Sequence, residues 1–219
     1  MSFGGQRGLF VDMDGTLADS LAVLDEVYHS FLLKYGKTGS ASEFAALNGP
    51  PLVQIITILK QHHKLKPSEP ELLAHYQQEI AQAYNRVQPA SGAINIIKRA
   101  VADGWKVAVV TSADMTIARV WLARVGLQEL VFTIIAGDSV QKGKPAPDPY
   151  LLALKRCDCR AADSLAVEDS PGGMQAAVSA GIPTVFINSS RDDKVLPPGV
   201  VGQIRVFSEL APFLDAPAS

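Results

Sequence analysis

The sequence has little cysteine and almost no net charge. Its 219 residues contain only Cys157 and Cys159, which are too few for a disulfide framework and lack a second ligand pair for zinc, so two reduced thiols are expected. The 20 Lys and Arg residues nearly balance the 22 Asp and Glu residues, which leaves a net charge of −2. Without a basic field, neither nucleic acid nor an anionic membrane is an expected partner.

Long hydrophobic runs are also missing. No apolar stretch approaches the ~18 residues needed to cross a bilayer, and residues 1–8 lack the apolar segment of a secretory signal. These absences predict a cytoplasmic protein. The composition, with 47% hydrophobic and 19% charged residues, is nevertheless typical of a globular chain with a sizeable core.

Short apolar runs predict the fold. Continuous apolar strands suit a parallel sheet that is buried on both faces, and helical patterns alternate with such runs from about residue 91 onward. We therefore expect an α/β fold with a Rossmann-like, doubly wound parallel sheet. The runs cover residues 8–14, 105–112, 131–137, 164–170, 184–188 and 202–207.

The segment between the first two runs has a different pattern. Its apolar residues step at three-to-four spacing, as Leu72, Tyr76 and Ile80 do, which is typical of amphipathic helices. The sequence thus predicts a helical cap domain over residues 20–89, inserted into a core domain formed by residues 1–19 and 90–219.

Polar clusters follow three of the predicted strands. In open parallel sheets, ligands bind outside the carboxyl ends of the strands, where the winding direction reverses, so these clusters are expected to converge. The clusters are Asp12 and Asp14, then Thr111 and Ser112, and finally Glu168 and Asp169.

Four carboxylates at one place require a cation. Two like charges ~4 Å apart repel by about 4 kcal/mol even at an effective dielectric constant of about 20. Hard oxygen ligands without a neighbouring His or Cys favour Mg²⁺, which would share its coordination shell with a phosphate. A phosphate ester is therefore the expected ligand.

The two aspartates after the first strand can divide the chemistry. Asp12 can attack phosphorus and form an acyl phosphate, which splits one difficult hydrolysis into two easier steps. Asp14 can protonate the leaving alkoxide and then activate water. Further phosphate donors are expected from Gly15 and from Thr111, Ser112 and Ala113 at a helix N-terminus.

A second positive charge is expected from the segment GKPAPDPY over residues 143–150. Lys144 can neutralise both the nucleophilic carboxylate and the phosphoryl oxygens. Lys142 competes for this role, but Pro145 and Pro147 restrict the loop around Lys144, which favours the latter.

Four motifs in order resemble the haloacid dehalogenase superfamily, in its branch of phosphoglycolate phosphatases and β-phosphoglucomutases with a helical C1-type cap. They are DMDGT (12–16), VVTS (109–112), GKPAPDPY (143–150) and VEDSPGGMQAA (167–177). The resemblance implies a cap that closes as a lid. It also implies Asp12 as nucleophile, Asp14 as acid and base, Thr111 and Lys144 as stabilisers, and Mg²⁺ held by Asp12, the Asp14 carbonyl and Asp169, with Glu168 assisting directly or through water.

Departures from the family's patterns narrow the activity. True dehalogenases lack the second aspartate, so Asp14 favours phosphoryl chemistry. The mutases carry a cap histidine twelve residues after the nucleophile and a cap-loop arginine, whereas this chain has Leu24 and no arginine over residues 47–54. Phosphonatases use a cap lysine, and neither Lys34 nor Lys37 stands in an evidently apolar segment that would depress its pKa.

Simpler interpretations exist for single motifs. The first aspartates do not form an EF-hand, because Val23 occupies the loop position that needs glutamate and a strand precedes the loop. Adjacent helical residues point in different directions, so His62 and His63 predict a solvated helix end rather than a metal site. A Gly-Pro turn over residues 48–51 is expected to dip toward the site.

These observations together predict a phosphatase. We expect an Mg²⁺-dependent phosphomonoester hydrolase that acts on a small phosphorylated metabolite through an aspartyl-phosphate. A β-phosphoglucomutase-like phosphotransferase and a catalytically idle phosphate-binding regulatory module stay open as alternatives. The expected assembly is a monomer or weak homodimer, and sugar phosphates, phosphoglycolate and nucleotides all stay open as substrates.

Overall fold

The computed structural model describes residues 6–188 and 196–215 and is built around a parallel sheet, as the sequence predicts. Six strands lie in the order β5-β4-β1-β6-β7-β8, and every neighbouring pair is parallel. The strands are β1 (Gly8–Val11), β4 (Lys106–Val110), β5 (Thr133–Ile135), β6 (Ser164–Glu168), β7 (Thr184–Ile187) and β8 (Val200–Ile204).

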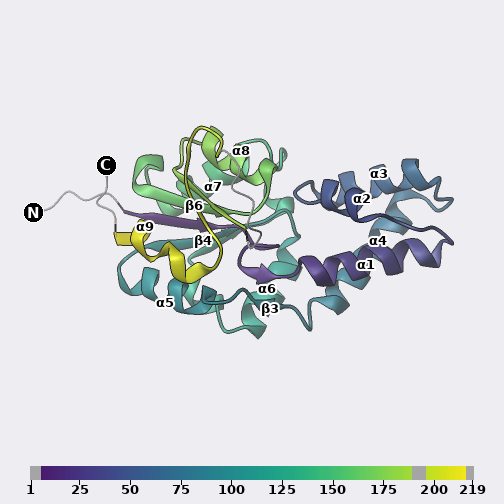
Figure 1. The fold of residues 1–219 in the computed structure, drawn as a ribbon, viewed down its shortest axis with the longest axis horizontal. Coiled ribbons are helices and arrows are strands. Elements are labelled where there is room, and N and C mark those ends of the chain that lie inside the picture. Colours follow the sequence, from purple (N-terminus) through teal and green to yellow (C-terminus); the bar gives the residue numbers. More distant parts are fainter. Residues whose placement is uncertain (1–5, 189–195, 216–219) are drawn as a thin grey trace, which may run out of the picture.

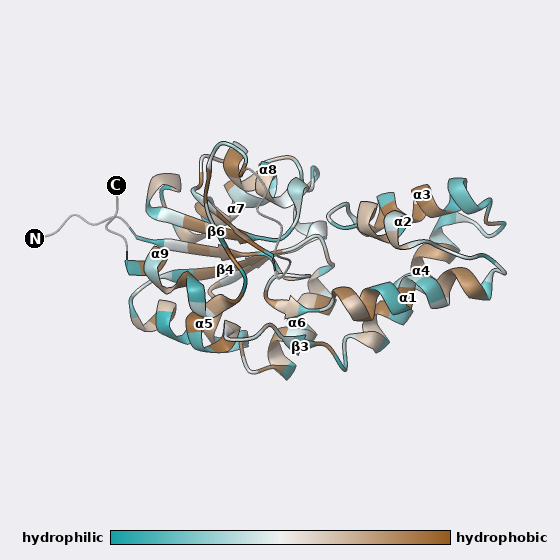
Figure 2. Ribbon diagram, in the orientation of Figure 1, coloured by the Kyte–Doolittle hydropathy of each residue, from teal (hydrophilic) through white to brown (hydrophobic). Residues whose placement is uncertain are grey.

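Helices cover both faces of the sheet (Figure 1). On β1, Leu9 and Val11 pack into one core cluster while Phe10 packs into the other, because successive side chains point to opposite faces. The central strands of the sheet are largely brown, and therefore hydrophobic, in Figure 2. The flanking helices are α5 (Ala93–Ala102), α6 (Met115–Arg124) and α9 (Ala211–Asp215) on one side, and α7 (Asp148–Cys157) and α8 (Pro171–Ser179) on the other.

Four further helices extend from one end of the sheet region (Figure 1). They are α1 (Leu21–Lys34), α2 (Ala41–Ala46), α3 (Leu52–His63) and α4 (Glu69–Ala83). The chain enters them through β2 (Ala18–Asp19) and leaves through β3 (Gln88–Pro89), and these two short strands pair antiparallel. None of the helices in the described residues combines the length and apolar character needed to cross a membrane.

The C-terminal end of α3 meets α2 through a hydrogen-bonded cluster of Glu43, His62 and His63. His63 Nε2 lies 2.8 Å from one oxygen of Glu43, and His62 Nδ1 contacts the other oxygen. The prediction that the two imidazoles point in different directions is wrong, because the same Glu43 carboxylate contacts a nitrogen of each ring. Burial opposes ionisation of Glu43, but hydrogen bonds from Tyr28 and both histidines outweigh it and lower the pKa of this carboxyl.

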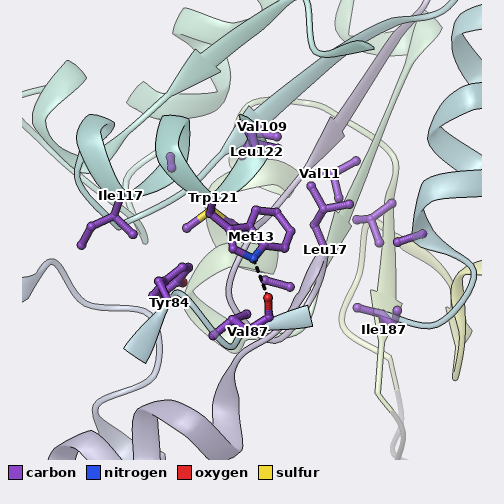
Figure 3. Packing of buried hydrophobic residues seen from close by; sticks show 14 of the residues in the cluster. Val11, Met13, Leu17, Tyr84, Val87, Val109, Ile117, Trp121, Leu122 and Ile187 are labelled. Atoms are coloured by element: carbon purple, nitrogen blue, oxygen red, sulfur yellow. Dashed lines mark hydrogen bonds between the residues drawn. The ribbon is translucent and has the colours of Figure 1, made fainter. Parts of the chain in front are cut away.

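Trp121 on α6 binds the chain at Val87, where it returns from the four helices toward β3. Its indole Nε1 donates to the Val87 carbonyl at 3.1 Å inside the buried cluster that Figure 3 shows. Arg124 donates to the same oxygen, so Val87 has two donors from one helix. The entry to β3 is thus held next to the sheet.

Replacing the two tryptophans tests this attachment. Trp121→Phe removes a buried hydrogen bond, whereas Trp105→Phe removes an indole N–H that is buried without a partner in the described residues. The first change should lower the free energy of unfolding by about 1 kcal/mol more than the second, measured by urea denaturation. Equal losses would show that the Val87 bond contributes nothing.

Candidate active site

The three predicted polar clusters converge at the carboxyl ends of the central strands. β1 lies between β4 and β6, with Val11 level with both Val109 and Val167. A cavity of about 270 Å³ opens beside these strand ends. Among the predicted site residues, its lining includes Asp12, Asp14, Thr111, Ser112, Ala113, Lys144 and Asp169.

Lys144 lies at the centre of the buried charges. Its Nζ is 2.5 Å from Asp12 Oδ1 and 2.6 Å from Glu168 Oε1, and it donates to the Val110 carbonyl at 2.9 Å. Burial lowers the pKa of Lys144, but the two carboxylates outweigh burial and raise it above its usual value. Lys144, and not the exposed Lys142, is therefore the lysine beside Asp12.

Glu168 lies behind the cavity and is fully buried. Tyr150 donates to its Oε1 at 2.5 Å, and Ser170 donates to its Oε2 at 3.4 Å. A Cβ on Gly173 would stand 1.9 Å from Oε2, so the start of α8 needs glycine there. Burial raises the pKa of Glu168 to about 8, although Lys144 and Tyr150 favour the ionised form.

Asp14 lies just beyond the end of β1, which is shorter than the predicted strand and stops at Val11. Ser20 donates to Asp14 Oδ1 at 2.7 Å, and the Tyr84 hydroxyl donates to the same oxygen. Burial raises the pKa of Asp14 to about 6 despite these donors. Sequence reasoning missed Tyr84 as a site residue, because its place in an apolar helical pattern indicates only packing.

Asp169 links the sheet to the stretch between β2 and β3, residues 20–87, which we call the four-helix segment. Thr16 donates to its Oδ1 at 3.3 Å, and Asn48 Nδ2 donates to its Oδ2 at 3.1 Å. Ser112 also reaches across, since its hydroxyl donates to the Gly49 carbonyl at 2.8 Å. The prediction that the turn at residues 48–51 dips toward the site is therefore confirmed.

The predicted helix N-terminus at Ser112 and Ala113 is wrong by two residues. α6 begins at Met115, because the Asp114 carboxylate accepts from Ile117 N and caps the helix. The Ala113 amide donates instead to Thr111 Oγ1 at 3.0 Å. Thr111 and its neighbours thus form a turn before the helix rather than its first turn.

The site has more buried negative charge than Lys144 can neutralise. Burial raises the pKa of Asp169 to about 7, and the Asp12 charge adds to that shift. Oxygens of Asp12, Glu168 and Asp169 lie within 4.8 Å of one another. A compact set of hard oxygen donors with uncompensated charge fits a divalent cation such as Mg²⁺.

Comparison with known proteins assigns the family. The model of the haloacid dehalogenase-like hydrolases matches residues 9–187. The chain belongs to this family. The superfamily that the four motifs resemble is therefore confirmed, and the doubly wound sheet fits it.

Several family members are similar over most of this chain. A bifunctional riboflavin kinase/FMN phosphatase of Arabidopsis thaliana is 27% identical over 83% of the chain, which spans only 48% of that protein. The fructose-1-phosphate phosphatase YqaB of Escherichia coli is 29% identical, over 82% of this chain and 95% of the relative. The phosphate complex of CbbY from Rhodobacter sphaeroides shares the fold, with a TM-score of 0.83 at 22% identity, over 94% and 96% of the two chains.

Gly15 gives a test of how tightly the site is packed. A Cβ there would stand 2.3 Å from Asp169 Oδ2, whereas one on Gly36 would meet nothing within 4 Å. Both glycines have positive φ, at +76° and +67°. Backbone strain should therefore lower the free energy of unfolding of each alanine variant by about 1–2 kcal/mol. Gly15→Ala should lower the stability measured by thermal denaturation by more than Gly36→Ala does, because of the added clash with Asp169. Equal losses of stability in the two variants would contradict this close packing of Gly15 against Asp169.

Proposed function

We propose that this protein is an Mg²⁺-dependent phosphomonoesterase that works through an aspartyl-phosphate on Asp12. One observation carries the proposal: Asp12 lines the cavity, is held by a buried lysine and shares the cavity with a second carboxyl, Asp14. That arrangement provides a nucleophile, a charge stabiliser and a proton donor around one phosphoryl group.

Asp12 would attack phosphorus while Lys144 restrains it. The ammonium holds Oδ1 of this carboxylate at 2.5 Å, and the second oxygen, Oδ2, would attack. As the phosphoryl group approaches, the same positive charge can offset the negative charge on the phosphoryl oxygens. Thr111, on the neighbouring strand end, would orient the phosphoryl group through its hydroxyl.

Asp14 would move the protons. Its pKa of about 6 lies close to neutral pH, so it can protonate the leaving alkoxide and then accept a proton from attacking water. Tyr84 and Ser20 hold the carboxyl in place from the four-helix segment and its entry. Loss of either hydrogen bond would change proton transfer without touching the nucleophile.

The same carboxylates would hold Mg²⁺. We assign the side chains of Asp12 and Asp169 and the Asp14 carbonyl as ligands, and Glu168 as a supporting charge whose oxygens already engage Lys144, Tyr150 and Ser170. When bound, the ion would offset negative charge on the phosphate. Lys144 and the ion would therefore divide the neutralisation of four carboxylates.

Residues 20–89 would act as a cap domain over this site. Leu24, at the position of the mutase histidine, lines the cavity and offers no proton-transferring group, which favours transfer to water over transfer to a sugar. The names of the Arabidopsis and Escherichia coli relatives describe phosphatases. The intact set of charged residues likewise favours an enzyme over an idle binding module.

Replacing Asp12 tests the nucleophile. Asp12→Asn should lower kcat for 4-nitrophenyl phosphate by at least about a thousandfold, because no acyl phosphate can form. Asp19→Asn, an exposed aspartate on β2, is the control and should keep wild-type turnover. Wild-type turnover by Asp12→Asn would refute the assignment, and mass spectrometry of acid-quenched wild-type enzyme should find the phosphoryl adduct on Asp12.

Metal removal tests the cation site. EDTA should abolish hydrolysis and added Mg²⁺ should restore it. Mg²⁺ should also raise the thermal midpoint of the wild type, since binding to the folded state alone stabilises it. This shift should vanish in Asp169→Asn and persist in Asp103→Asn, a surface control. An unchanged shift in Asp169→Asn would contradict the ligand assignment.

A further inference from the structure

The cavity has a second half, formed by the four-helix segment, that the chemistry of the phosphoryl group does not use. We propose that this half binds the alcohol part of the ester and selects alcohols that carry no negative charge; the proposal rests on the proposed function. We call it the leaving-group pocket. It comprises Leu24, Leu52, Ile55, Leu73, Gln77 and Ile80.

The leaving-group pocket is mostly aliphatic. Leu24 comes from α1, Leu52 and Ile55 from α3, and Leu73 and Ile80 from α4, so three helices present apolar side chains to one cavity. Such a surface favours the carbon atoms of a ligand and penalises a charged group that loses its hydration there.

The charged residues that line the whole cavity also favour an uncharged alcohol. Among the described lining residues there are five aspartates and one lysine, with no arginine or histidine. That lysine, Lys144, already has Asp12, Glu168 and the Val110 carbonyl as partners. Among the described residues that line the cavity, no positively charged side chain therefore remains to bind a carboxylate or a second phosphate on the substrate.

The N-terminus of α6, next to the leaving-group pocket, already binds two carboxylates of this chain. The N-terminus of α6 lies at the cavity wall and would ordinarily attract an anion. Asp114 accepts from Ile117 N at 2.9 Å, and Asp138 accepts from Met115 N at 3.4 Å, so two carboxylates occupy this end. An anionic leaving group would meet their repulsion instead.

Among the six residues of the leaving-group pocket, Gln77 is the polar one. The Gln77 amide lines the cavity and makes no hydrogen bond with the described residues, so it can both donate to and accept from a hydroxyl. The pocket therefore fits a small neutral alcohol with an apolar flank and a further hydroxyl. It disfavours phosphoglycolate, sugar bisphosphates and nucleotides that carry more than one phosphate.

Matched esters test the charge selection. With Mg²⁺ present, kcat/KM should be at least about tenfold higher for phenyl phosphate than for 4-carboxyphenyl phosphate, and for fructose 1-phosphate than for fructose 1,6-bisphosphate. Leu73→Lys should reduce both ratios by about tenfold. Leu33→Lys makes the same change at a leucine of α1 that is 72% exposed and lies outside the cavity, and it should leave both ratios unchanged.

Gln77 gives a second variant that keeps the charge unchanged. Gln77→Leu should raise KM for fructose 1-phosphate several-fold and leave KM for phenyl phosphate unaltered, because only the sugar offers hydroxyls. Gln78→Leu, on the exposed side of the same helix, should alter neither value. Equal rates on the neutral and charged esters, or identical ratios in Leu73→Lys and Leu33→Lys, would overturn the proposal.

Binding separates this proposal from the proposed function. Calorimetry of the same four esters with Asp12→Asn measures selection without turnover. Tighter binding of the neutral esters would support the leaving-group pocket even if the wild type hydrolysed none of them, a result that would refute only the phosphatase. Hydrolysis without a preference in either rate or binding would refute only the pocket.

Discussion

The ammonium of Lys144 is the charge around which the site is organised. It stands in the interior with Asp12 and Glu168 within 2.6 Å, and it also satisfies the Val110 carbonyl at the end of β4. Breaking a buried ion pair by removing one partner typically costs about 3–5 kcal/mol, because the remaining charge stays buried. The order of the central strands brings these groups together, since β1 lies between β4 and β6.

The charge that Lys144 leaves uncompensated gives the site its chemistry. Burial raises the pKa values of Asp14, Glu168 and Asp169 toward neutrality, so the folded chain holds carboxyls that are ready to bind a cation or to exchange a proton. A surface cluster of acids would be hydrated and would lack this reactivity. Stability is thus set against function at one place in the fold.

The four-helix segment completes the site and does more than cover it. Tyr84 holds Asp14, Asn48 holds Asp169, and the Gly49 carbonyl accepts from Ser112. Any movement of these helices away from the sheet would break all three contacts, so closure and the arrangement of the acids are physically linked. The same helices provide the apolar wall that would meet the alcohol, which couples substrate choice to that closure.

Local patterns in the sequence determined the strands, the fold class and the charged residues of the site. Short continuous apolar runs suit strands that are buried on both faces of a sheet, and the residues at their ends follow directly along the chain, as Asp12 and Asp169 do. Tertiary structure alone decided the partners of those residues. The three-to-four spacing around Tyr84 and Gln77 says which residues share a helix face, but not that one meets Asp14 and the other an open cavity. The start of α6, by contrast, depends on a local contact, because Asp114 accepts from Ile117 N three residues further along the chain. The contacts of Tyr84 with Asp14 and of Asn48 with Asp169 join residues far apart in the chain, and no local spacing encodes them.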